Sequence, residues 1–331
     1  MKAAVVTRYG APEVLEIRDV PAPVPGDDEV LVRVRASSVC FGDRIVRRGP
    51  LFVRLLNGLR RPKAAILGAD LAGTVVSVGK NVTRFAPGDL VFGSRGEKFG
   101  GYAEFACVAE RGFLAAKPRT MTLEEAAPLF VGGVCALYFL RKAAIRPGEK
   151  VLVHGASGSL GTFAVQLAKY YGAHVTAVCG PTNVELVRSL GADAVVDYTT
   201  KDFTSDGPAY DVICDVLGKA GFPHSLRALK PGGRYMLVGF PENLPAILAA
   251  MTRGLWAHLR GRAVFMTGPA RPVQADLEFL KTLIEQGRLR SVIGRTYTLT
   301  DIVEAHRYAD SNHKVGNVVV AIAETASPPT A

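Results

Sequence analysis

Hydrophobic and polar residues follow two different rhythms along the 331-residue chain. Over the first 120 residues, short runs rich in β-branched residues, such as Glu29–Val34 and Gly73–Val78, are separated by turn sequences such as Pro87-Gly88-Asp89. Short runs of this kind predict strands, and no long helical period lies between them. We therefore predict a small, mostly antiparallel, barrel-like domain in this part of the chain.

The rhythm changes near Met121. Thr122 and Glu125 have the spacing of a helix capping box, and an apolar helical segment through Ala136–Leu140 follows. Strands and helices then alternate, which predicts a parallel sheet covered on both faces, in the doubly wound α/β class. The six predicted strands are Lys150–His154, His174–Val178, Ala194–Val196, Val212–Asp215, Arg234–Val238 and Ala263–Met266.

The pattern leaves this alternation after Gly268. One amphipathic helix, Ala275–Gln286, precedes short strands at Arg295–Leu299 and Asn317–Ile322. The simplest arrangement returns this segment to the first domain. We therefore predict one domain from residues 1–121 and 269–331, and a second from residues 122–268.

Composition and charge narrow the class of protein. No apolar run approaches the ~20 residues that cross a bilayer, and Arg8 interrupts the start too soon for a signal peptide. We expect a cytoplasmic protein without a membrane span. The net charge is +10, and seven basic residues lie between Arg44 and Lys63. A solvated amphipathic surface explains this cluster, and so does contact with cofactor phosphates or a substrate entrance.

The glycine-spaced turn after the first parallel strand carries the clearest chemistry. Gly155, Gly158 and Gly161 lie between the strand Lys150–His154 and a helical segment. Glycines at this spacing let the backbone approach a pyrophosphate, which the helix N-terminus attracts. No Asp or Glu occurs between Gly155 and Val184, so the second strand ends without the carboxylate that selects NADH. The cofactor predicted from this stretch is NADPH.

These motifs resemble the quinone oxidoreductase branch of the medium-chain dehydrogenase/reductase superfamily. The turn Gly155–Gly161 resembles that branch's AxxGxxG variant, and Gly68–Gly73, Phe85–Val91 and Gly100–Phe105 are similar to the superfamily's N-terminal domain. The resemblance implies a GroES-like catalytic domain, a Rossmann domain and hydride transfer from a nicotinamide. It also implies a small, apolar, electrophilic substrate, and we expect a homodimer.

Many members of that superfamily hold a catalytic zinc ion. This chain keeps Cys40-Phe41-Gly42-Asp43, but in Gly68-Ala69-Asp70 an alanine stands where those members have a histidine ligand. Alanine cannot coordinate a metal, and the four-cysteine structural zinc loop is missing. We therefore expect no metal, and Cys40 is interpreted first as a small buried residue.

The resemblance also implies positions for the site. Cys40, Asp43 and Arg44 lie where the substrate cleft begins, although a structural role for Asp43 is an equal alternative. Cys135 replaces a threonine that touches the nicotinamide, and Tyr198 matches a tyrosine beside the adenosine phosphate. The predicted cofactor-binding residues are Cys135, Gly155, Ser157, Gly158, Ser159, Leu160, Gly161, Gly180, Thr182, Asn183, Tyr198, Gly239 and Asn317.

Three functions stay open at this point. The first is zinc-independent, NADPH-dependent reduction of a quinone or an α,β-unsaturated carbonyl compound. The second is an alcohol or aldehyde dehydrogenase, which the retained Cys40 and Asp43 favour. The third is a cofactor-binding interaction protein for RNA or a membrane surface, although no platform for single-stranded nucleic acid is present. The apolar segment Leu244–Arg262 is interpreted as helix packing, a dimer contact or a substrate wall.

Overall fold

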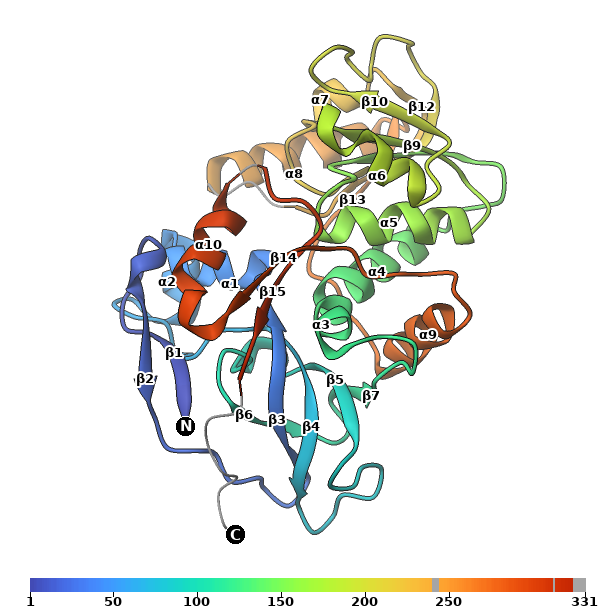
Figure 1. Ribbon diagram of the computed structural model, residues 1–331. Helices are drawn as coiled ribbons and strands as arrows, with labels where there is room; N and C mark the ends of the chain where they lie inside the picture. Colours follow the sequence, from blue (N-terminus) through green and yellow to red (C-terminus); the bar gives the residue numbers. More distant parts are fainter. Residues whose placement is uncertain (240–243, 312, 324–331) are drawn as a thin grey trace. The chain divides into compact units, whose positions relative to one another are not determined.

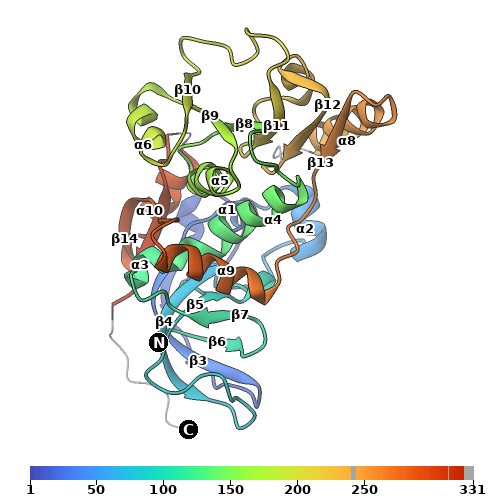
Figure 2. The ribbon, with the colours of Figure 1, turned by 90° about the vertical axis from the view of Figure 1, so that its right-hand side faces the viewer.

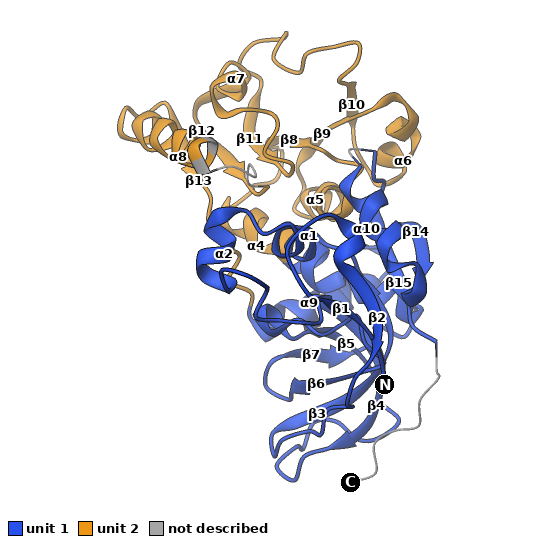
Figure 3. Ribbon diagram, turned by 90° about the vertical axis from the view of Figure 1, so that its left-hand side faces the viewer, with its two compact units in different colours: residues 1–134, 273–331 blue, residues 135–272 orange. Residues whose placement is uncertain are grey.

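The computed structural model describes residues 1–239, 244–311 and 313–323. The chain forms two compact units (Figures 1 and 3): residues 1–134 with 273–331, and residues 135–272. The segment 122–134, predicted in the second domain, lies in unit 1 because its helical turns contact the unit 1 strands β3 and β4. The domain boundaries as folding units stay a prediction.

Unit 1 is built on a mixed, mostly antiparallel sheet. Seven described strands take part in it, and only the pair β14–β15 runs parallel. A separate antiparallel pair is formed by β1 (Lys2–Val6) and β2 (Leu15–Asp19). The order is β14 (Ile293–Thr298), β15 (Asn317–Ala321), β3 (Glu29–Ser38), β4 (Asp70–Val78), β5 (Leu90–Ser94) and β7 (Phe113–Ala116), with β6 (Phe105–Ala109) paired to β3.

The core of unit 1 explains these strands. Val30, Val32 and Val34 of β3 are buried at every second position, as period-two alternation predicts. Gly73 of β4 has no room for a side chain, because a Cβ there would overlap the carbonyl oxygen of Arg33 on β3. The close pairing of β3 with β4 therefore depends on a glycine.

Five described α-helices belong to unit 1. They are α1 (Phe41–Arg48), α2 (Leu51–Asn57), α3 (Leu123–Ala126), α9 (Gln274–Glu285) and α10 (Ile302–Asp310). The predicted capping box is present, since Thr122 Oγ1 accepts from the Glu125 amide at 3.2 Å. Helix α10 was not predicted, although Ile302, Ala305 and Ala309 are spaced as one buried helical face.

Unit 2 is a parallel six-stranded sheet in the described residues, in the order β10-β9-β8-β11-β12-β13. This is the strand order of the Rossmann fold, so the predicted class is confirmed. The strands are β8 (Lys150–His154), β9 (His174–Cys179), β10 (Ala194–Asp197), β11 (Tyr210–Asp215), β12 (Leu229–Leu237) and β13 (Ala263–Met266). The helices are α4 (Cys135–Lys142), α5 (Ser159–Tyr170), α6 (Val184–Ser189), α7 (Phe222–Ser225) and α8 (Leu244–Leu259).

The central strands of this sheet are apolar on both faces. Val151, Leu152 and Val153 of β8 are fully buried, as a strand covered by helices on both sides requires. Helix α5 packs on β8 and β9 and also contacts α4 (Figure 2). The strand order reverses between β8 and β11, and ligands of such sheets bind beyond the carboxyl ends of the strands at this point.

The segment Leu123–Lys142 bears on the expectation that the chain has no membrane span. Leu123–Lys142 is long and apolar enough to cross a bilayer by length and composition. The most apolar part of it is 67% buried inside the structure, as is usual for a core helix. It spans the end of unit 1 and helix α4 of unit 2.

Candidate functional site

The glycine turn lies between β8 and α5, at the carboxyl edge of the parallel sheet. Gly155 follows β8 with φ of +82°, a conformation that favours glycine, and its amide donates to the Val178 carbonyl of β9 at 3.2 Å. Gly158 is the N-cap of α5. The first turn of the helix therefore directs the amides of Leu160 and Gly161 outward, as in sites that bind a phosphate.

Two glycines of this turn have different surroundings. A Cβ at Gly161 would overlap the carbonyl oxygen of Gly155, so this glycine lets the helix pack against the turn. A Cβ at Gly158 would meet only that same oxygen, at 3.5 Å, which is ordinary contact. The protein itself leaves space beside Gly158, as a turn that lets a phosphate approach its backbone requires. Ser157 and Ser159, on either side of Gly158, are partly exposed.

The end of β9 carries no carboxylate. Gly180 is followed by a short 3₁₀ turn, Pro181–Asn183, in which Thr182 is exposed and Asn183 partly exposed. Tyr198 follows β10, and its hydroxyl lies beside Gly180, since a Cβ on that glycine would be 3.2 Å from it. The structure thus brings the predicted residues Gly180, Thr182 and Tyr198 to the same edge of the sheet.

A pocket of about 420 Å³ opens beside these residues, within unit 2. His154 from the end of β8 and Tyr198 after β10 line it, together with Lys201, Lys219 and His224. His154 Nδ1 lies 3.3 Å from the buried carboxylate of Asp215. The lining also carries one carboxylate, Asp202, whose Oδ1 lies 3.0 Å from His224 Nε2, so the lining has one carboxylate against two lysines.

The remaining predicted cofactor residues lie apart in the chain. Cys135 is partly buried and begins α4, directly after a π-helical turn, Phe130–Val134. Gly239 follows β12, where its amide donates to the Asp215 carbonyl at 3.3 Å. Asn317, in unit 1, is buried, and its amide group donates to the Val292 carbonyl at 2.9 Å. Their roles toward a cofactor stay predictions.

In unit 1, Asp43 is fully buried. Its carboxylate accepts backbone N–H groups from Cys40 at 2.9 Å, Gly68 at 2.9 Å and Ala69 at 3.1 Å. Burial raises the pKa of Asp43, although these hydrogen bonds oppose the shift. The carboxylate ties α1 to the loop before β4, which is the structural role that the sequence left open.

Cys40 and Asp70 are two further buried residues near Asp43. Burial, and then the Asp43 charge, raise the pKa of the Cys40 thiol well above its ordinary value, so the thiol is protonated near neutral pH. Burial also raises the pKa of Asp70 to about 8, while Ser38 Oγ and the Val131 amide donate to its oxygens. Between these residues Ala69 offers no ligand atom, and the described part of the chain contains no group of three or more ligating side chains.

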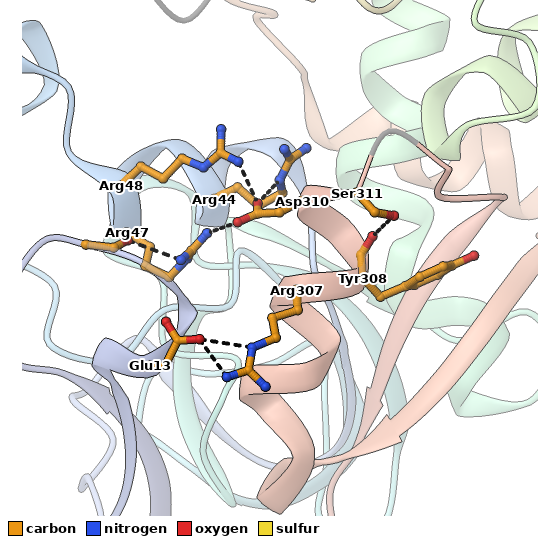
Figure 4. Close-up of polar contacts among 9 residues, drawn as sticks. Glu13, Arg44, Arg47, Arg48, Arg307, Tyr308, Asp310 and Ser311 are labelled. Atoms are coloured by element: carbon orange, nitrogen blue, oxygen red, sulfur yellow. Dashed lines mark hydrogen bonds and ion pairs between the residues drawn. The ribbon is translucent and has the colours of Figure 1, made fainter.

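Arg44 belongs to a cluster on one carboxylate. Asp310 of α10 accepts from Arg44 Nε at 2.6 Å and from Arg47 Nη2 at 2.5 Å, and Arg48 lies 3.3 Å away (Figure 4). Arg47 is fully buried. Three guanidinium groups around one carboxylate leave an excess of positive charge along the second half of α1.

Sequence reasoning missed a cation near this cluster. Lys314, just before β15, is partly buried, and burial followed by the Arg44 charge lowers its pKa to about 8, against an opposing effect of Cys40. Its ammonium makes no hydrogen bond or ion pair with the described residues. The local sequence, His313-Lys314-Val315-Gly316, does not indicate that Lys314 lies near Arg44. That location depends on the packing of α10 beside β15.

His306 of α10 was also missed. It is fully buried, its ring lies edge-on to Tyr102, and neither ring nitrogen has a hydrogen-bond partner in the described structure. Burial, and then the Arg47 charge, lower the pKa of His306 to about 3. The imidazole is therefore neutral at physiological pH and adds no charge to the cluster.

The fold and the glycine turn define a class of protein. Its members join a dinucleotide-binding parallel sheet to a mostly antiparallel β domain in one chain. The first family model that matches describes an alcohol dehydrogenase GroES-like domain, over residues 26–119. The second describes a zinc-binding dehydrogenase, over residues 190–320. The chain belongs to the medium-chain dehydrogenase/reductase superfamily and is a quinone oxidoreductase-like, nicotinamide-dependent oxidoreductase.

Individual relatives cover nearly the whole chain. A quinone oxidoreductase of Pseudomonas aeruginosa is 32% identical over 328 residues, which are 94% of this chain and 97% of that protein. An NADPH-dependent alkenal/one oxidoreductase of Arabidopsis thaliana is 30% identical over 332 residues, covering 97% and 79%. The structure of the quinone oxidoreductase from Coxiella burnetii matches with a TM-score of 0.86 at 28% identity, over 98% of this chain and 99% of that one. The predicted family and fold are confirmed.

Proposed function

We propose that this protein is a zinc-independent reductase that uses NADPH to reduce a quinone or an α,β-unsaturated carbonyl compound. The observation that carries the proposal is the set of side chains around Cys40. Ala69, next to Asp70, has no ligand atom where zinc-dependent members of the superfamily have a histidine. An alcohol dehydrogenase of the zinc type needs three ligands at such a centre, and these residues do not supply them.

The cofactor site fits a nicotinamide dinucleotide. The turn from Gly155 to Gly161 offers backbone amides and an open side at Gly158 for the pyrophosphate. A bound nicotinamide supplies a hydride, which can reduce an electron-poor carbon without a metal. We propose that Cys135 and Gly239 complete the site toward the nicotinamide end.

The choice of NADPH rests on charge. The end of β9 lacks the carboxylate that repels a 2′-phosphate, and the hydroxyls of Thr182 and Tyr198 can donate to one. Lys201 and Lys219 line the adjoining pocket, although Lys201 is 2.7 Å from Asp206 in an exposed ion pair. The attraction for the 2′-phosphate is therefore moderate, because exposed and shared charges contribute little.

The residues of unit 1 supply the rest of the chemistry. Reduction of a quinone or an enone places negative charge on the substrate oxygen and then requires a proton. Lys314 can donate that proton, because a pKa of about 8 leaves it charged at neutral pH and able to release its proton. Arg44 strengthens the positive field beside it. Asp43 and Cys40 act as positioning residues, since the structure buries both.

A screen of quinones, enals and enones, with NADPH oxidation as the readout, tests this function. We expect turnover of at least one of these electrophiles and much slower oxidation of simple alcohols with NADP⁺. A protein that oxidises alcohols and ignores every electrophile would contradict the proposal in favour of an alcohol dehydrogenase. The cytoplasmic location and the homodimer stay predictions.

A further inference from the structure

Helix α8 of unit 2 has an apolar stripe on its exposed side. Its exposed apolar side chains are Leu248 (53% exposed), Met251 (48%), Leu255 (58%), Trp256 (49%) and Leu259 (76%). Residues 248, 251, 255 and 259 recur at helical spacing and so share one face. The other face carries Gly254 and Ala257, which are buried, and a side chain at Gly254 would overlap the Phe265 ring of β13.

Positive charge borders this stripe, and the surrounding segment of sequence has no acidic residue. Arg253, Arg260 and Arg262 are exposed, and no ion pair is recorded for them among the described residues. The guanidinium of Arg260 lies 3.8 Å from the centroid of the Trp256 ring, and that of Arg262 lies 5.8 Å from it. Residues 243–275 contain no Asp or Glu. An apolar stripe with Trp and Leu, flanked by arginines, is the composition of helices that lie in a membrane interface.

We propose that α8 docks this protein on an anionic lipid surface. The Leu and Met side chains enter the boundary between headgroups and acyl chains, Trp256 lies at headgroup depth, and the three arginines contact lipid phosphates. Docking depends on this helix and not on the proposed reaction. If the proposed function holds as well, docking brings the enzyme to the place where apolar quinones dissolve.

A second copy of the chain is a poorer occupant of this face. A two-fold interface with its axis at α8 would place α8 against α8, and each arginine would then face arginines of the other copy. The segment 243–275 has no carboxylate to pair with them, so contact of this kind brings like charges together. An anionic lipid surface is complementary to the same charges. Nucleic acid would pair with the arginines but leaves the Leu and Met stripe in water.

Trp256 is the only tryptophan of the chain, so its emission reports directly on this helix. The full chain without cofactor is mixed with phosphatidylcholine vesicles and with vesicles in which roughly one third of the lipid is phosphatidylglycerol. We expect a blue shift, and quenching by lipids with brominated acyl chains, with the anionic vesicles only. An unchanged emission spectrum with the anionic vesicles would overturn the proposal.

Variants separate the helix from the overall charge. Each arginine at an anionic surface strengthens binding roughly fivefold, so the triple variant R253Q/R260Q/R262Q should lose about 100-fold in vesicle co-sedimentation. The matched control is R119Q/R146Q/R227Q, which removes the same charge from exposed arginines outside this segment and should lose far less. Equal losses would show that net charge binds the vesicles and α8 does not.

The apolar stripe has its own matched pair. Leu255→Ser should weaken co-sedimentation about tenfold, since it removes a large buried apolar area in the bound state. Leu55→Ser changes an equally exposed leucine in the basic segment of unit 1 and should have little effect. A larger effect of Leu55→Ser would assign docking to α2. A blue shift that grows with protein concentration without lipid, and disappears in Leu255→Ser, would show a second copy on this face.

Discussion

The start of α1 in unit 1 and the start of α5 in unit 2 use polar groups in opposite ways. In unit 1, the Asp43 carboxylate is buried and all of its contacts come from the protein's own backbone and side chains. In unit 2, the turn at Gly158 leaves space beside it and keeps backbone amides outward. A site that is saturated internally stabilises the fold, whereas a site with open donors binds a ligand. The two helix starts should therefore respond differently to mutation.

The largest expected effect is on the free energy of unfolding, from Asp43→Ala. The substitution leaves three buried backbone N–H groups without an acceptor, at on the order of 1–3 kcal/mol each. We expect a loss of several kcal/mol, about 3 kcal/mol or more, in urea unfolding. Asp19→Ala, in an exposed ion pair with Lys2, is the matched control and should cost less than about 1 kcal/mol. A variant that is fully stable but inactive would show that Asp43 takes part in the reaction.

The two glycines of the turn give the next largest effect. Gly158→Val should weaken NADPH binding about 100-fold, because the side chain enters the space kept for the pyrophosphate. It should change stability by no more than about 1 kcal/mol, since its backbone is extended and only the N-cap preference is lost. Gly161→Ala should instead destabilise the fold, because its Cβ overlaps the Gly155 carbonyl oxygen. Calorimetric titration with NADPH and thermal unfolding of both variants test this. If Gly158→Val lost stability and Gly161→Ala lost only NADPH affinity, the proposed roles of the two glycines would be wrong.

Lys314 is the test of reactivity in unit 1. Lys314→Met should lower kcat roughly tenfold to 100-fold while the dissociation constant for NADPH changes little. The ammonium loses its proton as pH rises through a pKa of about 8, so the wild-type rate should fall above that pH. Lys314→Arg keeps the positive charge but cannot release a proton, so it should lower kcat as Lys314→Met does, and neither variant should show this fall. A wild-type rate that stays level from pH 7 to about 10 would exclude Lys314 as the proton donor.

The smallest of these effects concerns cofactor choice. We expect NADPH to bind about tenfold more tightly than NADH, equivalent to about 1.4 kcal/mol, because no carboxylate at the end of β9 repels the 2′-phosphate. Thr182→Asp introduces that carboxylate and should reverse the preference. The dissociation constants of both reduced cofactors at low and moderate salt measure this. Equal affinities in the wild type would show that the missing carboxylate does not set the choice.

The same contrast explains what could be predicted from the sequence. The turn at Gly155–Gly161 was predictable because strand, glycine spacing and helix are adjacent in the chain, and local geometry fixes their function. The corner around Cys40 and Asp43 was less predictable. Which donors reach a buried carboxylate depends on Gly68 and Ala69, which lie 25 and 26 residues further along.

Helix α10 contains one feature that the sequence pattern indicates and one that it does not. The helical spacing of its apolar residues Ile302, Ala305 and Ala309 is present in the sequence, between two short strands. The contact of Asp310 with Arg44 was not readable, because 266 residues separate them. Lys314 became a candidate only through that packing, since its pKa depends on a neighbour that no local pattern indicates.

The central claim is reduction of an electrophile by NADPH without a metal. The direct measurement is the rate of NADPH oxidation with an accepted quinone or enone, before and after dialysis against a chelator, with the zinc content of the same sample. The account predicts far less than one zinc per chain and an unchanged rate, because Ala69 offers no ligand atom where the zinc branch has a histidine. One zinc per chain, lost together with the activity and restored on its return, would contradict it.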